Sequence, residues 1–194
     1  MIDWNEVDQE LKRLDLKTFR THLNSKDLEE IKRRTDQGAN NFRIFQNLLA
    51  KIVKSKLLSS SASEEALLKL TTVLFLTEGP LGYYINIYSY GLILEKHHDV
   101  WFEEKQEFVS SFEEIERVPL SVKLKFLERH GFKSFSKICP KKVRNAIAHY
   151  NFHIEPEGTI DIEGQKLTKK ESENIIHDIT EMLNLLSKNF SERK

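Results

Sequence analysis

The chain has 194 residues, 39% of them hydrophobic and 31% charged, proportions typical of one globular domain with a sizeable core. Its 30 Lys and Arg residues balance its 30 Asp and Glu residues, so a polyanion site has to come from a local cluster rather than from net charge. The single cysteine, Cys139, excludes an internal disulfide framework. Because the charged N-terminal residues also show no apolar leader, we expect a cytoplasmic protein.

Helical periodicity dominates residues 1–60, which we predict to be the N-terminal helices of the domain. Asp3 followed by Glu6 forms a capping pattern in front of an apolar stripe at helical spacing. A second helical region is expected from Ser25 toward Leu58. The serine-rich stretch that follows predicts a loop, with Ser63 as the cap of the next helix.

Residues 64–131 are predicted to form the central helices. The stretch 70–94 is apolar enough to suggest a membrane span, but Glu78 and the Gly-Pro pair beside it interrupt the stretch near its middle. We therefore expect a central helix or helix pair inside a soluble bundle, with its tyrosine-rich half in the core and no membrane contact. The acidic residues that follow are interpreted as a solvated face, and Gly131 as the left-handed cap of a short helix.

Two elements are predicted beyond that cap. Pro140 suits the first position of a helix over 140–150, which carries the most distinctive residues of the chain. The period then changes from helical to two, and two alternating runs around a Pro-Glu-Gly turn predict a β-hairpin over 152–163.

The chain closes with a predicted helix over 168–190, for which Thr168 and Glu171 form a capping box. The predicted fold class is therefore all-α. We expect a single helical bundle over 1–194, with a small β-hairpin between the helix at 140–150 and the C-terminal helix.

The helix at 140–150 contains the stretch KKVRNAIAHY, whose polar residues gather on one side. At 100° per residue the opposite, apolar side is expected to pack on the bundle, and it holds Val143, Ala146, Ile147 and Tyr150. Arg144 lies at one rim of the polar side and His149 at the other, about 140° apart, and Asn145 can touch His149 one turn later. This face predicts a groove with a fixed cation on one wall and a titratable imidazole on the other.

The surroundings of this helix favour an anionic ligand. No Asp or Glu occurs between Gly131 and Ile154, whereas Lys137, Lys141 and Lys142 do, and we predict that these lysines bind flanking RNA backbone. Arginine can donate two parallel hydrogen bonds to phosphate oxygens, and histidine both accepts and donates protons near neutral pH. The two side chains together therefore suffice to cleave RNA without a metal. One helix supplies only one histidine. Two copies facing each other in a dimer would supply two, so we expect a dimeric site.

The residues RNAIAH, an Arg and a polar residue followed three residues later by a His, resemble the signature of the HEPN superfamily (higher eukaryotes and prokaryotes nucleotide-binding). The resemblance implies a helical bundle, a homodimer formed through the motif helices, and metal-independent endoribonuclease activity that needs no cofactor. It also implies a role in toxin–antitoxin or other defence systems, with an antitoxin or regulatory protein as a partner. On this chain, Arg144 would stabilise the phosphate, His149 would act as general acid or base, and Asn145 would orient one of them.

The sequence departs from one branch of this superfamily. Toxins that a nucleotidyltransferase partner neutralises carry a Tyr two residues after the His. This chain has Asn151 at that position and Tyr150 beside it, on the side that we expect to face inward. Regulation by nucleotide transfer onto this tyrosine is therefore not expected.

Two alternatives to catalysis stay open. A nucleotide-, RNA- or protein-binding module would use Arg144 as an anion anchor without turnover, and a structural dimer would pair the same charges across its interface. Glu78 either caps the second half of its helix in solvent or holds a motif residue in place. His97, His98 and Asp99 are adjacent and have no partner pair at ligand spacing, so no metal site is predicted.

Overall fold

The computed structural model describes residues 2–54, 61–95, 100–102, 107–109 and 111–191, and most of them are helical, which confirms the predicted class. The N-terminal part holds α1 (Trp4–Leu11), α2 (Leu16–His22) and α3 (Ser25–Lys54). The central part holds α4 (Ala62–Leu76), the π-helical turn η1 (Thr77–Leu81), α5 (Gly82–Glu95), β1 (Val100–Phe102), β2 (Glu107–Val109), α6 (Phe112–Arg117) and α7 (Leu120–Arg129). The C-terminal part holds α8 (Lys133–Ile138), α9 (Lys141–Ala148), β3 (His153–Ile154), β4 (Ile160–Ile162), β5 (Gln165–Leu167) and α10 (Lys169–Ser191).

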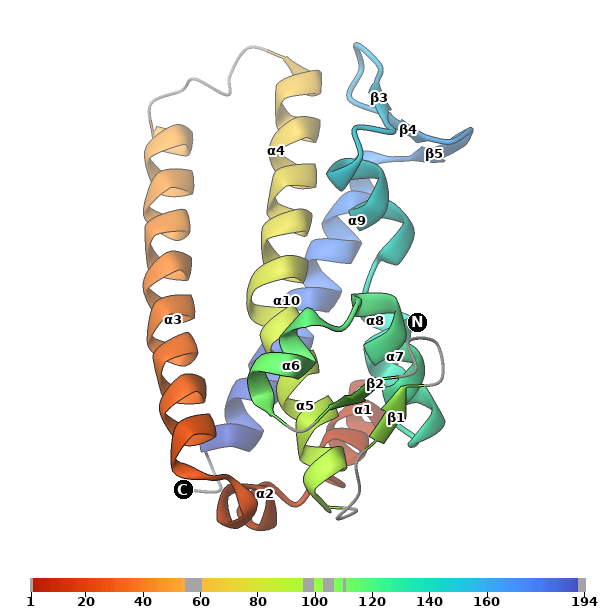
Figure 1. Ribbon diagram of the computed structural model, residues 1–194. Coiled ribbons are helices and arrows are strands. Elements are labelled where there is room, and N and C mark those ends of the chain that lie inside the picture. Colours follow the sequence, from red (N-terminus) through yellow and green to blue (C-terminus); the bar gives the residue numbers. More distant parts are fainter. Residues whose placement is uncertain (1, 55–60, 96–99, 103–106, 110, 192–194) are drawn as a thin grey trace.

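The long helices form the frame of the molecule (Figure 1). The helix α3, the continuous α4–η1–α5 segment and α10 run along one another, and α10 packs on α4 and reaches α1 and α8. The short helices α7 and α8 pack together at the lower end of the view, and α9 lies against α4 near the small sheet at the upper end. Within the described residues, none of the helices combines the length and the apolar character needed to cross a membrane.

The core centres on α5, as its tyrosine-rich sequence predicts. Every residue from Ile85 to Ile93 is buried, which is the pattern of a helix surrounded by protein on all sides. Two of its tyrosine hydroxyls are paired: that of Tyr88 donates to the carbonyl of Leu11 over 3.0 Å, and that of Tyr90 to the carboxylate of Asp27 over 2.6 Å. These bonds fix α5 against the N-terminal helices, because unpaired polar groups at this depth would be costly.

A π-helical turn joins α4 to α5 where the sequence predicts an interruption. The turn contains Pro80, whose nitrogen has no hydrogen to donate to the preceding turn. A locally wider helix absorbs the missing bond without ending the segment. The backbone also comes close here, since a Cβ on Gly82 would lie 3.1 Å from the carbonyl oxygen of Thr77. The same turn leaves Glu78 exposed.

The sheet after α9 contains the predicted hairpin and one further strand. β3 pairs antiparallel with β4, with Ile154 opposite Ile160, and β4 pairs antiparallel with β5. Ile160 and Ile162 are buried against Ala66 and Leu70 of α4. The apolar residues that alternate along β4 are therefore the ones that face the core. The prediction missed β5 because three residues are too few to show alternation.

A second antiparallel pair, β1 with β2, lies in the acidic region after α5, within the range that we predicted to form the central helices. Trp101 is opposite Phe108 in this pair. The expectation of helices throughout 64–131 is therefore wrong over these strands, since their short runs sit between charged residues and give no period-two signal.

Helix caps are confirmed at three of the predicted positions, one of which is Gly131, left-handed with a φ of 89° at the end of α7. A carboxylate oxygen of Asp3 accepts from the backbone nitrogens of Asn5 and Glu6 over 3.0 and 3.3 Å. Before α10, the backbone nitrogen of Glu171 donates to the Thr168 hydroxyl over 3.3 Å, and the Glu171 carboxylate accepts from the Thr168 nitrogen over 2.7 Å. This reciprocal pair is the predicted capping box.

Other boundaries differ from the prediction. α4 begins at Ala62 and is capped by Ser61, whose hydroxyl accepts from the backbone of Glu64, so Ser63 is not the cap. Pro140 is the residue before α9 rather than its first position, and the helix ends at Ala148, two residues earlier than predicted. The expected end of the second helix, near residue 58, lies outside the described residues.

Candidate functional site

The helix α9 packs on α4 next to the small sheet. Ala146 is buried in a cluster with Ala66 and Leu70 of α4, and Val143 and Ile147 pack beside it as half-buried residues. The small side chain of Ala146 lets the helix lie close to α4. The apolar side of α9 thus packs as predicted through these three residues, and its charged residues face outward.

The end of α9 differs from the predicted geometry. His149 is the first residue beyond the helix, and Tyr150 has a φ of 57°, in the left-handed region. The nitrogens of Tyr150 and Asn151 donate to the carbonyls of Ile147 and Ala146 over 3.3 and 2.8 Å, which is a Schellman motif. Because the chain reverses here, Tyr150 is 86% exposed rather than facing inward, and that expectation was wrong.

Arg144 is held by two side chains. Its Nε donates to the carboxylate of Glu78 on η1, and its Nη1 donates to Oδ1 of Asn145 over 2.9 Å. The neighbouring carboxylate raises the pKa of the Arg144 guanidinium above its ordinary value. Of the two roles left open for Glu78, the structure shows the contact with a motif residue. Since the guanidinium side chain is 26% exposed, part of it stays accessible.

His149 stands apart from this arrangement. Its imidazole is exposed, and among the described residues it has no side-chain partner. The predicted side-chain contact with Asn145 is absent, because the Asn145 amide oxygen accepts from Arg144 instead. A backbone bond of 3.0 Å, from the His149 nitrogen to the Asn145 carbonyl, links the two residues. The structure therefore fixes the cation and leaves the imidazole open to a ligand.

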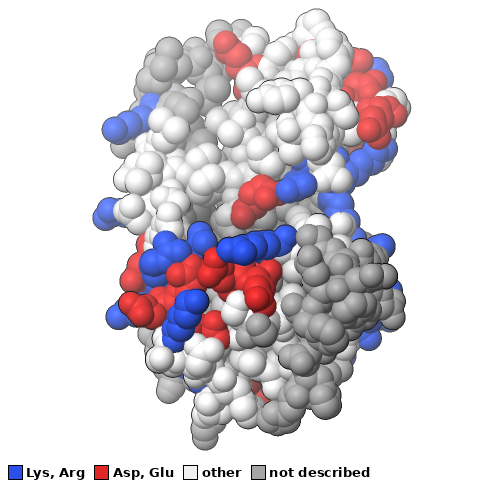
Figure 2. Space-filling view, in the orientation of Figure 1, with Lys and Arg blue, Asp and Glu red and all other residues white. Residues whose placement is uncertain are grey.

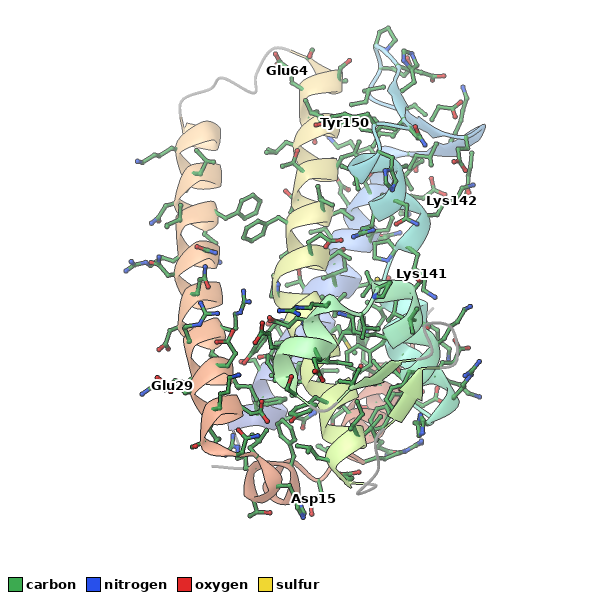
Figure 3. The ribbon with its side chains drawn as sticks, viewed as in Figure 1. Asp15, Glu29, Glu64, Lys141, Lys142 and Tyr150 are labelled. Carbon is green, nitrogen blue, oxygen red and sulfur yellow. The ribbon has the colours of Figure 1, made fainter. Side chains whose placement is uncertain are left out.

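The three predicted RNA-binding lysines are not gathered at one place. Lys142 donates to the side chain of Gln165 over 3.0 Å, and Figure 3 shows Lys142 on the outer side of α9 and Lys141 near its start. Lys137 lines a small cavity of about 140 Å³ with residues of α1 such as Glu6. Lys141 and Lys142 flank the motif residues, whereas Lys137 belongs to another part of the surface.

An open groove of about 900 Å³ runs past Arg144 and Glu78, and sequence analysis missed its other charged residues. They are Arg34 of α3, Glu116 and Arg117 of α6, and Lys123 of α7. Arg34 pairs with Glu116 over 2.8 Å. On the face that Figure 2 shows, basic side chains stand beside acidic ones across the middle, and the described part of this face carries no continuous basic patch.

Lys123 is the most unusual residue of this groove because it is a buried cation. Its Nζ donates to Oδ1 of Asn86 on α5 over 2.6 Å, and burial lowers the pKa of the ammonium to about 8, although Glu116 and Glu78 act in the opposite direction. A sequence signal existed: Lys123 falls at helical spacing between Leu120 and Leu127, on a face that otherwise packs inward.

Metal chemistry finds no support in the donors that the structure places. Within the described ranges, no group of three His, Cys, Asp or Glu side chains could hold a metal ion. His97, His98 and Asp99 lie outside those ranges. Burial raises the pKa of the Cys139 thiol to about 11, so this cysteine is a packed thiol at neutral pH and not a nucleophile.

Comparison with known proteins gives no match: no family model fits the chain, and no curated protein or solved structure resembles it significantly.

Proposed function

We propose that this chain is a metal-independent endoribonuclease of the HEPN type, acting as a homodimer in a toxin or defence system. One observation carries the proposal: Glu78 and Asn145 hold Arg144, while the imidazole of His149, at the end of the same short helix, is exposed and unbonded. A held cation and an open acid–base group are the two parts that phosphodiester cleavage needs.

The reaction requires no cofactor. The 2′-oxygen attacks the adjacent phosphorus and loses its proton to a general base, the bond from phosphorus to the 5′-oxygen breaks, and a general acid protonates that oxygen. The products are a 2′,3′-cyclic phosphate and a 5′-hydroxyl. His149 serves as base or acid, and the His149 of a second copy supplies the other role. Arg144 stabilises the negative charge that grows on the phosphate oxygens.

Glu78 acts in this scheme as a positioning residue. Its contact with Nε fixes the orientation of the Arg144 guanidinium. Among the described residues, Nη2 of this guanidinium has no side-chain partner. A planar guanidinium held at one edge presents its other edge in a fixed direction, which favours forked recognition of a phosphate.

The test is cleavage of a labelled single-stranded RNA in excess EDTA. We expect His149→Ala to lower the rate by about 10²–10⁴-fold and Arg144→Ala by about 10²–10³-fold, with both variants folded. Matched controls are His177→Ala on α10 and Arg33→Ala on α3, which remove exposed residues of the same types elsewhere and should cut at the wild-type rate.

A second candidate is a binding module without turnover. It is favoured by the pairing of Arg144 with a carboxylate and by the zero net charge of the chain. It predicts that the wild type binds RNA or a nucleotide, that Arg144→Ala weakens binding, and that no cyclic phosphate forms. An inert wild type in the EDTA assay would exclude the enzyme in favour of this module or of a structural dimer.

A further inference from the structure

Tyr150 is a surface aromatic whose position folding does not explain. Its side chain is 86% exposed, and among the described residues it makes no side-chain hydrogen bond and no ring contact. Figure 3 shows it at the end of α9, directly after the candidate catalytic histidine. A ring left in water contributes no buried area to stability.

The backbone at Tyr150 makes the choice of residue still less favourable. Tyr150 has a φ of 57°, a conformation in which any Cβ is strained and glycine is preferred. The chain uses glycine elsewhere for the same purpose: Gly131, with a φ of 89°, ends α7 in the same motif. A bulky residue kept in a strained and exposed position points to a role outside folding.

The chain neighbours of this ring favour a nucleobase as its partner. Ala148, His149 and Asn151 are all exposed and are small or polar, so these neighbours do not extend the ring into an apolar patch of the kind that proteins bury in an interface. Arg144 and Lys141, earlier on the same helix, are cations that suit a phosphate backbone. An aromatic face next to backbone-binding cations is the usual arrangement for single-stranded nucleic acid.

We propose that Tyr150 is a nucleobase subsite, on which the base beside the phosphate held at Arg144 stacks. This inference rests on the proposed function, and it names the substrate class more narrowly. The ring needs an unstacked base, so single-stranded RNA binds and the same strand within a duplex does not. Stacking is sequence-tolerant because every base offers a π-face, so this subsite selects strand state rather than sequence.

Binding of a fluorescent, uniformly 2′-O-methyl single-stranded RNA tests the subsite, because this RNA cannot be cut. We expect Tyr150→Ala and Tyr150→Gly to bind about 5- to 150-fold more weakly than the wild type, and Tyr150→Phe to bind equally well. Tyr150→Gly should also raise the melting temperature by about 2–4 °C, since glycine relieves the backbone strain. An RNA backbone of the same length in which every position is abasic should bind wild type and Tyr150→Ala alike.

A gain in stability together with a loss of affinity is a combination that a purely structural tyrosine would not give. If Tyr150→Ala binds like the wild type while Arg144→Ala binds weakly, the RNA site stands and the base subsite is wrong. If Tyr150→Ala instead breaks a dimer in sedimentation, the ring is a protein contact and the proposal falls. If the wild type binds no RNA at all, the proposed function fails, and the subsite fails with it.

Discussion

The helices α7 and α9 end with the same backbone motif, but the residues around the end of α7 are packed in the core, whereas those around the end of α9 are exposed. Each helix is followed by a histidine and then by a residue of positive φ, with matching Schellman bonds: Gly131 follows His130, and Tyr150 follows His149. At the end of α7 the next residue, Phe132, is buried in the core. At the end of α9 the residues from 148 to 151 are all exposed.

The two histidines show the same contrast. Nδ1–H of His130 donates to the carbonyl of Phe126 over 2.8 Å, and its ring packs on that of Phe126 at 4.4 Å between centroids. The imidazole of His149 has neither kind of contact within the described residues. The same backbone motif is therefore followed by packed side chains at α7 and by exposed ones at α9. The motif alone does not reveal which residues are functional.

The largest expected effect concerns the buried cation of α7. The pKa of Lys123 is about 8 in the folded protein and about 10.4 in an unfolded chain, so between these values the unfolded state binds the extra proton. The unfolding free energy of the wild type should therefore rise, relative to Lys123→Met, by about 2.5 kcal/mol from pH 8 to pH 10.4.

Denaturant unfolding at fixed pH values measures this difference. The raised pKa of Cys139 works in the opposite direction above about pH 9, because its folded state keeps the proton longer. Both proteins carry this cysteine, so the comparison cancels its contribution. A difference that stays flat across the interval would show that Lys123 keeps its ordinary pKa.

The next largest effect is the change in unfolding free energy when a residue of positive φ is replaced by alanine. Gly131→Ala should lower the unfolding free energy by about 1–2 kcal/mol, because alanine is strained at this φ and its Cβ would lie 3.2 Å from the Arg13 guanidinium. Tyr150→Ala keeps the strain that already exists and should change stability by less than about 0.5 kcal/mol. Equal losses in thermal or denaturant unfolding would mean that the end of α9 is also structural.

The smallest effect separates the two histidines. His130→Ala loses a hydrogen bond and a ring contact and should cost about 1 kcal/mol. His149→Ala should change the unfolding free energy by less than about 0.5 kcal/mol, while lowering the cleavage rate as proposed above. Loss of stability in His149→Ala would contradict the view that this imidazole has no folding role.

Much of the frame was predictable because its signals are local. The buried run of α5, the cap at Asp3 and the capping box at Thr168 depend on residues within a few positions of one another. The missed elements are β5, the pair of β1 and β2, and the helix α8, which are too short to display a period. The inward orientation of Tyr150 failed because the prediction continued the helix through two residues that the Schellman turn occupies.

The sequence by itself determined the helical class, the central helix, and the helix that carries Arg144 and Asn145 and ends before His149, since all of these follow from spacing along one chain segment. The tertiary structure alone decided that Arg144 donates to Glu78, 66 residues away, and that the Lys123 ammonium donates to the side chain of Asn86. Such pairings depend on how α4, α5, α7 and α9 pack. Periodicity shows which face of a helix is buried, but it does not show which residue of another helix lies opposite.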